Sequence, residues 1–283
     1  MNPPEKDTPF PSAIQDRAQA RALTATPQTT SSSYRLAYDD TEFLERDELR
    51  AVRLELELLK PELTMQDHGV NTTVVVFGSA RIPDPDLEDT AGAGIQPATV
   101  QAALARKRDY YTMARTFARL VAADQHPCGD PYVVVTGGGG GIMEAANRGA
   151  DDAEAPSVGL NIVLPMEQLP NRFITPELCF QFHYFAIRKL HFLLRATALA
   201  IFPGGFGTLD ELFDALTLIQ TGKMDRIPIV LFGRDYWQRI INFEAMAAEG
   251  VINTEDLSLI DYAESAEDGW RIIREFHRRT RED

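Results

Sequence analysis

Apolar residues between positions 72 and 263 fall into short continuous runs that alternate with segments of helical periodicity. The runs are rich in Val and Ile and apolar at consecutive positions, which is typical of strands buried on both faces of a parallel sheet. The alternation predicts successive βαβ units in an α/β fold, with a mostly parallel sheet and helices on both faces. The predicted strands are 72–78, 132–138, 157–164, 197–205, 227–233 and a short strand near 260, and the predicted helices are 99–123, 142–153, 185–196, 208–221, one containing 236–248, and one at the end.

The first 34 residues differ from the rest, because they are rich in Pro, Ser, Thr and Gln and show no sustained hydrophobic period. This composition predicts a disordered tail over 1–34. Leu49, Val52, Leu56 and Leu59 then recur at helical spacing, which predicts a helix over about 41–60 that ends at Pro61. We expect residues 35–283 to form a single domain, with a long surface loop over 81–98.

The net charge of −14 argues against binding to nucleic acid or to anionic membranes, since both require a basic face. Any anionic ligand is therefore expected to be small and held locally. The two cysteines, Cys128 and Cys179, lack metal-ligand spacing, and Arg195 interrupts the most apolar stretch, so no run of about 20 apolar residues could span a bilayer. No basic segment followed by an apolar one begins the chain. We expect a reducing, cytoplasmic setting, with no metal and no cofactor.

Glycine clusters follow three of the predicted strands, at the sheet edge where α/β proteins bind ligands. A glycine loop that leads into a helix lets a phosphate approach the free N–H groups of the first turn. The spacing fits neither G-x-G-x-x-G nor the P-loop, so a dinucleotide dehydrogenase and a P-loop NTPase are disfavoured, although tight turns alone could also explain the glycines. The clusters are Gly78 with Ser79, Gly137 to Gly141, and Gly204, Gly205 and Gly207 with Thr208, whose hydroxyl could contact a phosphate or cap the helix.

Charged residues accompany these loops. Glu211 lies about one turn into the helix after the third loop, whereas Asp210 points roughly 100° away and is interpreted as offsetting the helix dipole. Arg188 and Lys189 begin another helix, where a cation could meet a phosphate or could simply be solvated. His183 and His191 are not at metal-ligand spacing, and no G-x-S-x-G nucleophile is present.

The stretch PGGFGTLDE, residues 203–211, resembles the PGGxGTxxE motif of the LONELY GUY (LOG) family, and FAIRK resembles the Arg-Lys pair that precedes it there. IMEAANRGA and GLNIVLPMEQLPN are similar to the longer bacterial branch, and the likeness spans about residues 72–235. The resemblance implies a Rossmann-like, doubly wound fold, a homodimer or larger assembly, and hydrolysis of a nucleoside 5′-monophosphate to free base and ribose 5-phosphate. The nucleotide would be AMP-like or a cytokinin riboside 5′-monophosphate. The label of lysine decarboxylase that family members have carried gains no support, because no lysine lies in a pyridoxal-phosphate motif.

The resemblance also assigns residue roles. It places the catalytic pair on Arg188 and Glu211. Because cleavage of the ribosyl C–N bond builds positive charge on the ribose, our hypothesis is that Glu211 binds the ribose hydroxyls or activates water. The substrate-binding residues that it implies are Gly78, Ser79, Gly138, Gly139, Gly140, Gly141, Glu144, Lys189, Gly204, Gly205, Gly207 and Thr208. The form FGSARIP departs from the CGSS form of many plant members, which affects base specificity more than reaction type. A non-catalytic nucleotide sensor or carrier, and a transferase, stay open as alternatives.

Overall fold

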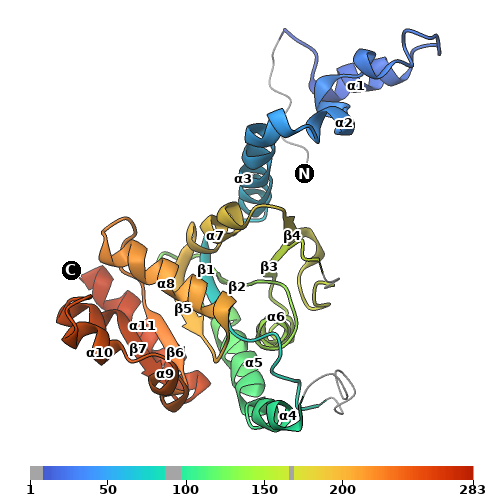
Figure 1. Cartoon of the computed structure of the whole chain (residues 1–283). Coiled ribbons are helices and arrows are strands. Elements are labelled where there is room, and N and C mark those ends of the chain that lie inside the picture. The colour runs from blue at the N-terminus through green and yellow to red at the C-terminus, as the bar shows by residue number, and fades with distance from the viewer. Residues whose placement is uncertain (1–8, 87–96, 166–168, 283) are drawn as a thin grey trace. The chain divides into compact units, whose positions relative to one another are not determined.

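The computed structural model describes residues 9–86, 97–165 and 169–282 (Figure 1). The chain divides into two compact units, residues 1–56 and residues 57–283. In the described residues, no helix is both long and apolar enough to cross a membrane. Most of the loop predicted over 81–98, residues 87–96, lies outside the described residues.

Within the first unit, α1 (Ala13–Arg21) forms in the stretch for which the sequence predicts a disordered tail. Ser12 and Gln15 make a capping box that satisfies the free N–H groups at the helix start. The pattern of apolar positions did not predict this helix, because α1 buries none of its residues and so needs no apolar face. The first eight residues of the predicted tail lie outside the described residues. The unit also contains α2 (Thr41–Leu44) and the 3₁₀ turns η1 (Ser32–Tyr34), η2 (Ala37–Asp39) and η3 (Asp47–Leu49).

Helix α3 (Arg50–Asp67) begins later than the helix predicted over 41–60, after α2 and η3, and continues through Pro61 instead of ending there. A proline inside a helix cannot donate a hydrogen bond to the carbonyl four residues earlier, which here belongs to Glu57. The Nε2 atom of His191 lies 3.3 Å from this carbonyl oxygen and takes the place of the missing donor. A side chain from a distant helix thus lets α3 extend past the proline.

The second unit contains a seven-stranded sheet, as far as the described residues extend, with the strand order β4-β3-β2-β1-β5-β6-β7. Every pair of neighbouring strands is parallel, which confirms the predicted α/β fold. The order reverses beside β1, which pairs with β2 on one side and β5 on the other. The strands are β1 (Thr72–Phe77), β2 (Tyr132–Thr136), β3 (Ser157–Ile162), β4 (Cys179–Phe182), β5 (Ala196–Ile201), β6 (Ile229–Phe232) and β7 (Ile260–Ala263).

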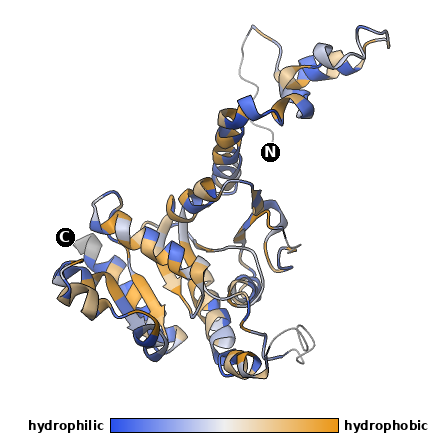
Figure 2. Cartoon of the chain, in the orientation of Figure 1, coloured by the Kyte–Doolittle hydropathy of each residue, from blue (hydrophilic) through white to orange (hydrophobic). Residues whose placement is uncertain are grey.

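Helices cover both faces of this sheet, and its strands are mostly hydrophobic (Figure 2). Val74 and Val76 of β1 pack with α5, α6 and α11 on one face, while Val75 and Phe77 pack with α3, α7 and α8 on the other. The consecutive apolar positions are thus explained by burial on two sides. The helices of this unit after α3 are α4 (Ala98–Ala105), α5 (Arg108–Ala122), α6 (Ile142–Asp152), α7 (Phe185–Leu193), α8 (Phe206–Gln220), α9 (Arg234–Ile240), α10 (Phe243–Ala248) and α11 (Ala266–Glu282), with 3₁₀ turns η4 (Pro176–Leu178) and η5 (Thr254–Leu259).

Two predicted helices are each split into two. The helix predicted over 99–123 breaks at Arg106 and Lys107, which separate α4 from α5. The helix containing 236–248 breaks between α9 and α10, where the Asn242 side chain caps α10 by accepting a bond of 2.8 Å from the N–H of Ala245. Local capping outweighs the continuous helical period at this break.

Candidate functional site

Backbone hydrogen bonds join the three glycine loops that follow β1, β2 and β5. The N–H of Ser79, after β1, donates to the carbonyl of Pro203, after β5, at 3.0 Å. The carbonyl of Ser79 in turn accepts a bond of 3.1 Å from the N–H of Ile142, after β2. The predicted convergence of the three loops is therefore present, at the point where the strand order reverses.

Two of the glycines are required by these contacts. Gly141 has a φ of +63°, and a Cβ there would overlap the carbonyl oxygen of Ser79 and lie 2.7 Å from the carbonyl carbon of Ala80. A Cβ on Gly204 would overlap the hydroxyl of Thr208. At Gly205 and Gly207, by contrast, a Cβ would meet no described atom within 4 Å, so open space lies beside these positions.

The N-terminus of α8 is available to an anion. The helix begins at Phe206, not at Thr208 as predicted, and its N-cap is Gly205, which makes no side-chain capping bond. Thr208 is therefore not the cap; it is buried in the first turn, with its hydroxyl against Gly204. The first N–H groups of α8 have no intrahelical acceptor, which makes this helix start suited to a phosphate. The Tyr236 hydroxyl donates to the Gly204 carbonyl at 2.7 Å and holds the loop from α9.

Glu211 is a buried carboxyl group on the same helix. Its side chain is 6% exposed, and its Oε2 atom has no hydrogen-bond partner among the described residues. Burial raises the pKa of Glu211 to about 7, although the positive charges of Lys189 and Arg188 act to lower it. A carboxyl group with this pKa can take up and release a proton near neutral pH.

Arg188 connects α7 to the second glycine loop. Its Nε donates to the carbonyl of Leu160 at 2.7 Å, and its Nη2 donates to the carbonyl of Gly137 at 3.4 Å. The guanidinium lies 5.0 Å from the ring centre of Phe192. Burial lowers the pKa of Arg188, and the charge of Glu211 opposes that shift. The two predicted catalytic residues therefore influence each other electrostatically.

Lys189 points to α8 and is paired with carboxylates there. Its Nζ lies 3.0 Å from Asp210 and 3.5 Å from Asp214. Burial acts to lower the pKa of Lys189, but the hydrogen bond to Asp210 and the charges of Asp214 and Glu211 raise it above its usual value. Asp210, interpreted from the sequence as offsetting the helix dipole, also holds this lysine in place.

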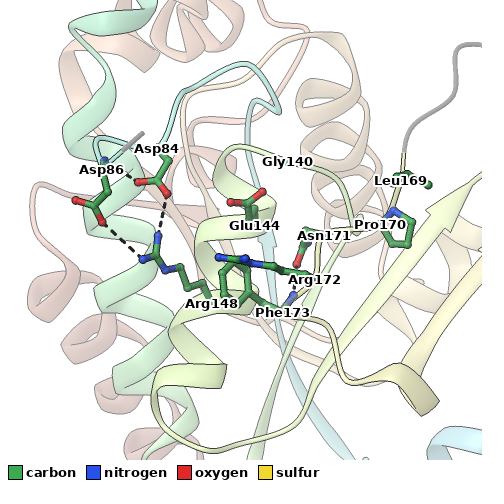
Figure 3. Close-up of a pocket in the computed structure, with 10 residues that line it drawn as sticks. All are labelled: Asp84, Asp86, Gly140, Glu144, Arg148, Leu169, Pro170, Asn171, Arg172 and Phe173. Carbon is green, nitrogen blue, oxygen red and sulfur yellow. Dashed lines mark hydrogen bonds and ion pairs between the residues drawn. The ribbon is translucent and has the colours of Figure 1, made fainter. Parts of the chain in front are cut away.

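A cleft of about 490 Å³ opens beside the second glycine loop (Figure 3). The Tyr111 hydroxyl donates to Glu144 at 3.1 Å, and Arg148 pairs with Asp84 at 2.8 Å and with Asp86 at 3.6 Å. Arg188 and Glu211 do not line this cleft. Its lining residues are Asp84, Asp86, Gly140, Glu144, Arg148, Leu169, Pro170, Asn171, Arg172 and Phe173.

Two supporting residues were not recognised in the sequence. Asn171 binds the second glycine loop three times, through its N–H to the Gly138 carbonyl at 2.9 Å and through Nδ2 to the carbonyls of Gly138 and Gly139 at 3.3 and 3.0 Å. Its amide also donates to Asn147 at 2.9 Å. Tyr236 is the second such residue. Asn171 ends the GLNIVLPMEQLPN phrase, so its place in that motif was a usable signal.

The structure thus brings part of the predicted set together. The loop around Gly204 to Thr208, Glu211, Lys189 and Arg188 share one region through the charges and contacts described above. Gly138 and Gly139 are held by Asn171, while Gly140 and Glu144 line the cleft. No group of three potential metal ligands from His, Cys, Asp and Glu occurs in the residues that the structure describes.

Comparison with known proteins finds a matching family model and a plant relative. Residues 143–273, which contain α7, β5 and α8, match the family model described as possible lysine decarboxylase. The cytokinin riboside 5′-monophosphate phosphoribohydrolase LOG4 of Arabidopsis thaliana is 28% identical over 149 residues, covering 51% of this chain and 67% of the plant protein.

Solved structures with a similar arrangement include the molybdenum cofactor binding protein of Rippkaea orientalis, at 18% identity and a TM-score of 0.46, covering 73% of this chain and 97% of that one. Another is the molybdenum cofactor carrier protein of Chlamydomonas reinhardtii, at 18% identity and a TM-score of 0.44, covering 72% of this chain and 97% of that one. Both TM-scores lie below 0.5, so the fold assignment rests on the strand order. The residues that the family model matches contain the PGGFGTLDE and FAIRK motifs, and the plant relative carries the LOG name, so both comparisons support the resemblance of this chain to the LOG family.

Proposed function

We propose that this protein hydrolyses the N-glycosidic bond of a nucleoside 5′-monophosphate and releases the free base and ribose 5-phosphate. The observation that supports this most directly is Glu211, a buried carboxyl group with a pKa of about 7, one turn from an uncapped, glycine-rich helix start. A helix start that can bind phosphate and a proton acceptor about one turn along the same helix suit a substrate that carries both a phosphate and a sugar. The name of the plant relative describes the same class of reaction.

The 5′-phosphate binds at the start of α8 in this proposal. The N–H groups of the first turn and the helix dipole favour a negative charge there, and Gly205 and Gly207 leave room for the phosphate oxygens. Lys189 contributes positive charge from α7, although it shares that charge with Asp210 and Asp214. Most of the phosphate contacts are therefore assigned to the main chain.

Cleavage of the C1′–N bond builds positive charge on the ribose, so a carboxylate near the sugar stabilises the transition state. We assign this role to Glu211, which also accepts a proton from the attacking water. The water oxygen bonds to C1′, the electrons of the broken bond leave with the base, and the base takes up a proton. Arg188, held between Leu160 and Gly137, orients the ribose phosphate and the departing base.

The base is assigned to the side of the second glycine loop, where the cleft of Figure 3 opens at Gly140. Three carboxylates and two guanidinium groups line this cleft, so it suits an uncharged, hydrogen-bonding ring better than a second phosphate. Glu144 offers an acceptor and Arg172 a donor. AMP and a cytokinin riboside 5′-monophosphate are the two candidate substrates.

The decisive experiment incubates the purified protein with AMP, CMP, GMP, UMP and a cytokinin riboside 5′-monophosphate, and separates the products by chromatography. We expect base release from at least one nucleotide, and a loss of about 10²- to 10⁴-fold in the Glu211→Ala variant. Glu249→Ala, which removes an exposed carboxylate from the end of α10, serves as the control and should keep the parental rate. Nucleotide binding without any base release would refute hydrolysis and support a non-catalytic nucleotide binder, whereas release only with an added acceptor would support a transferase.

We also propose that the protein works as a homodimer or larger homo-oligomer in a reducing, cytoplasmic compartment. Large apolar side chains on α7, at its C-cap and at the start of α8 are exposed, namely Phe185, Leu190, Leu194 and Phe206, the last at 92%. Both cysteines are free thiols, as is usual in a reducing compartment. Light scattering coupled to size-exclusion chromatography measures the subunit count, and a monomer at micromolar concentration would contradict the assembly.

A further inference from the structure

We propose that Glu57 of α3 is a positioning residue for Arg188, an inference that rests on the proposed function. The Oε1 atom of Glu57 accepts a hydrogen bond of 2.8 Å from the N–H of His183, and its Oε2 atom accepts one of 3.0 Å from the N–H of Tyr184. These residues immediately precede α7, where backbone N–H groups lack intrahelical acceptors. One carboxylate from α3 therefore fixes the start of α7, the helix that carries Arg188.

Glu57 also contacts α7 on the other side of Arg188. Its main-chain carbonyl lies 3.3 Å from Nε2 of His191, and this carbonyl is free to accept because Pro61 has no N–H to offer it. His191 is 4% exposed, so water does not compete strongly for the contact. The three contacts of Glu57 thus lie on both sides of Arg188, two just before α7 and one within it.

A separate ion pair holds the far end of the same helix. Glu62 binds Arg195 through two oxygens, with Nη1–Oε2 and Nη2–Oε1 distances of 2.6 Å each. Arg195 lies beyond the last residue of α7 and seven positions after Arg188. Breaking this pair removes a contact between α3 and the residues after α7 and leaves the hydrogen bonds of the Glu57 carboxylate and of Arg188 in place, which makes Glu62 a control on the same helix. The charge of Glu62 acts on His191 only through space.

The placement of α7 matters because the acceptors of Arg188 belong to other elements. Leu160 lies on β3 and Gly137 follows β2, so the guanidinium keeps its bonds of 2.7 and 3.4 Å only if α7 stays in register with the sheet edge. A misplacement of about 1 Å in a catalytic group can lower a rate about 100-fold. Glu57 acts through Arg188 and not on the substrate, since its carboxylate is occupied by two backbone N–H groups.

The test compares the parent with Glu57→Ala, Glu57→Gln, Glu62→Ala, Arg188→Ala and the double variant Glu57→Ala/Arg188→Ala. The measured quantities are kcat and KM for the nucleotide that the parent hydrolyses, melting temperature, and amide hydrogen exchange at His183 and Tyr184. We expect Glu57→Ala to lower kcat about 10- to 100-fold with KM within about 3-fold, and to speed exchange at both amides. Glu57→Gln keeps one acceptor oxygen and should recover part of kcat.

Two comparisons separate positioning from a general loss of stability. Glu62→Ala should lower the melting temperature while keeping kcat within about 3-fold of the parent, and Glu57→Ala should cost no further kcat once Arg188 is already Ala. Equal kcat losses in Glu57→Ala and Glu62→Ala, or losses that multiply in the double variant, would overturn the inference.

The failure of the proposed function has a different signature. A parent protein that releases no base from any nucleotide refutes hydrolysis, whereas the exchange measurement still tests whether Glu57 fixes the start of α7. Unchanged exchange at His183 and Tyr184 in Glu57→Ala would overturn the positioning role regardless of activity.

Discussion

Replacing Glu211 with Gln should make the protein more stable at alkaline pH and inactive at every pH. The carboxyl group has a pKa of about 7 in the folded protein against 4.5 for the ordinary group, because burial disfavours its charged form. Between these two values the folded state binds more protons than the unfolded state, so stability falls as the pH rises through this window. Multiplying the difference by about 1.4 kcal/mol per pH unit gives a cost of about 3 kcal/mol once the pH exceeds 7.

Urea denaturation of the parent and of Glu211→Gln at pH 5 and pH 8.5 measures this cost. Glutamine cannot ionise, so the free energy of unfolding of the variant should rise relative to the parent by about 2.5 kcal/mol between the two pH values. Glu249→Gln, at an exposed position, reports the effect of removing one carboxylate without burial. A stability difference between parent and Glu211→Gln that is the same at both pH values would refute the reasoning from burial.

The same titration should control activity. If Glu211 accepts a proton from water, only the ionised form works, and kcat/KM of the parent should rise with pH to a plateau, with a midpoint near 7. The pH range of highest activity is then the range in which the buried charge destabilises the fold most. A kcat/KM midpoint near 4.5 would show that the carboxyl group is not buried in the working enzyme.

Other substitutions test the surrounding geometry. Arg188→Lys keeps a positive charge but cannot reach both carbonyl acceptors with one planar group, so steady-state kinetics should show a loss of about 100-fold in kcat. Gly204→Ala forces a Cβ against the hydroxyl of Thr208 and should lower stability by about 1–3 kcal/mol and weaken nucleotide binding by calorimetry, whereas Gly205→Ala enters open space and should leave stability unchanged. Tyr236→Phe removes the bond to the Gly204 carbonyl and should cost about 1 kcal/mol in thermal denaturation.

The fold was predictable because its signal is local. A strand such as β1, with Val at consecutive positions, is explained by burial between two helical layers, and no distant residue is needed to recognise it. Strand β4 was absent from the prediction, because it is four residues long, lies at the sheet edge and alternates buried with exposed residues. Helix α3 was misjudged at Pro61 because the compensating contact comes from His191, 130 positions later in the sequence.

The candidate site also contains residues that could be predicted from the sequence and contacts that could not. The glycine loops, Arg188 and Glu211 could be named from the sequence, because each belongs to a short motif of contiguous residues, such as FAIRK or PGGFGTLDE. The pairing of Lys189 with Asp210 and the bond from Tyr236 to Gly204 join separate helices and loops, and no local pattern reports such contacts. The catalytic roles of Arg188 and Glu211 are predictions that the nucleotide assays test.

The bonds that join the three loops have a consequence for how this site can change through evolution. Ser79, Pro203 and Ile142 meet through main-chain atoms, which every substitution other than one to proline retains. Side chains that line the cleft, such as Glu144 and Arg172, can therefore be exchanged one at a time while the proposed phosphate-binding loop keeps its shape. In the proposed function, the preferred base can therefore change among descendants of this chain while the residues assigned to the sugar stay the same.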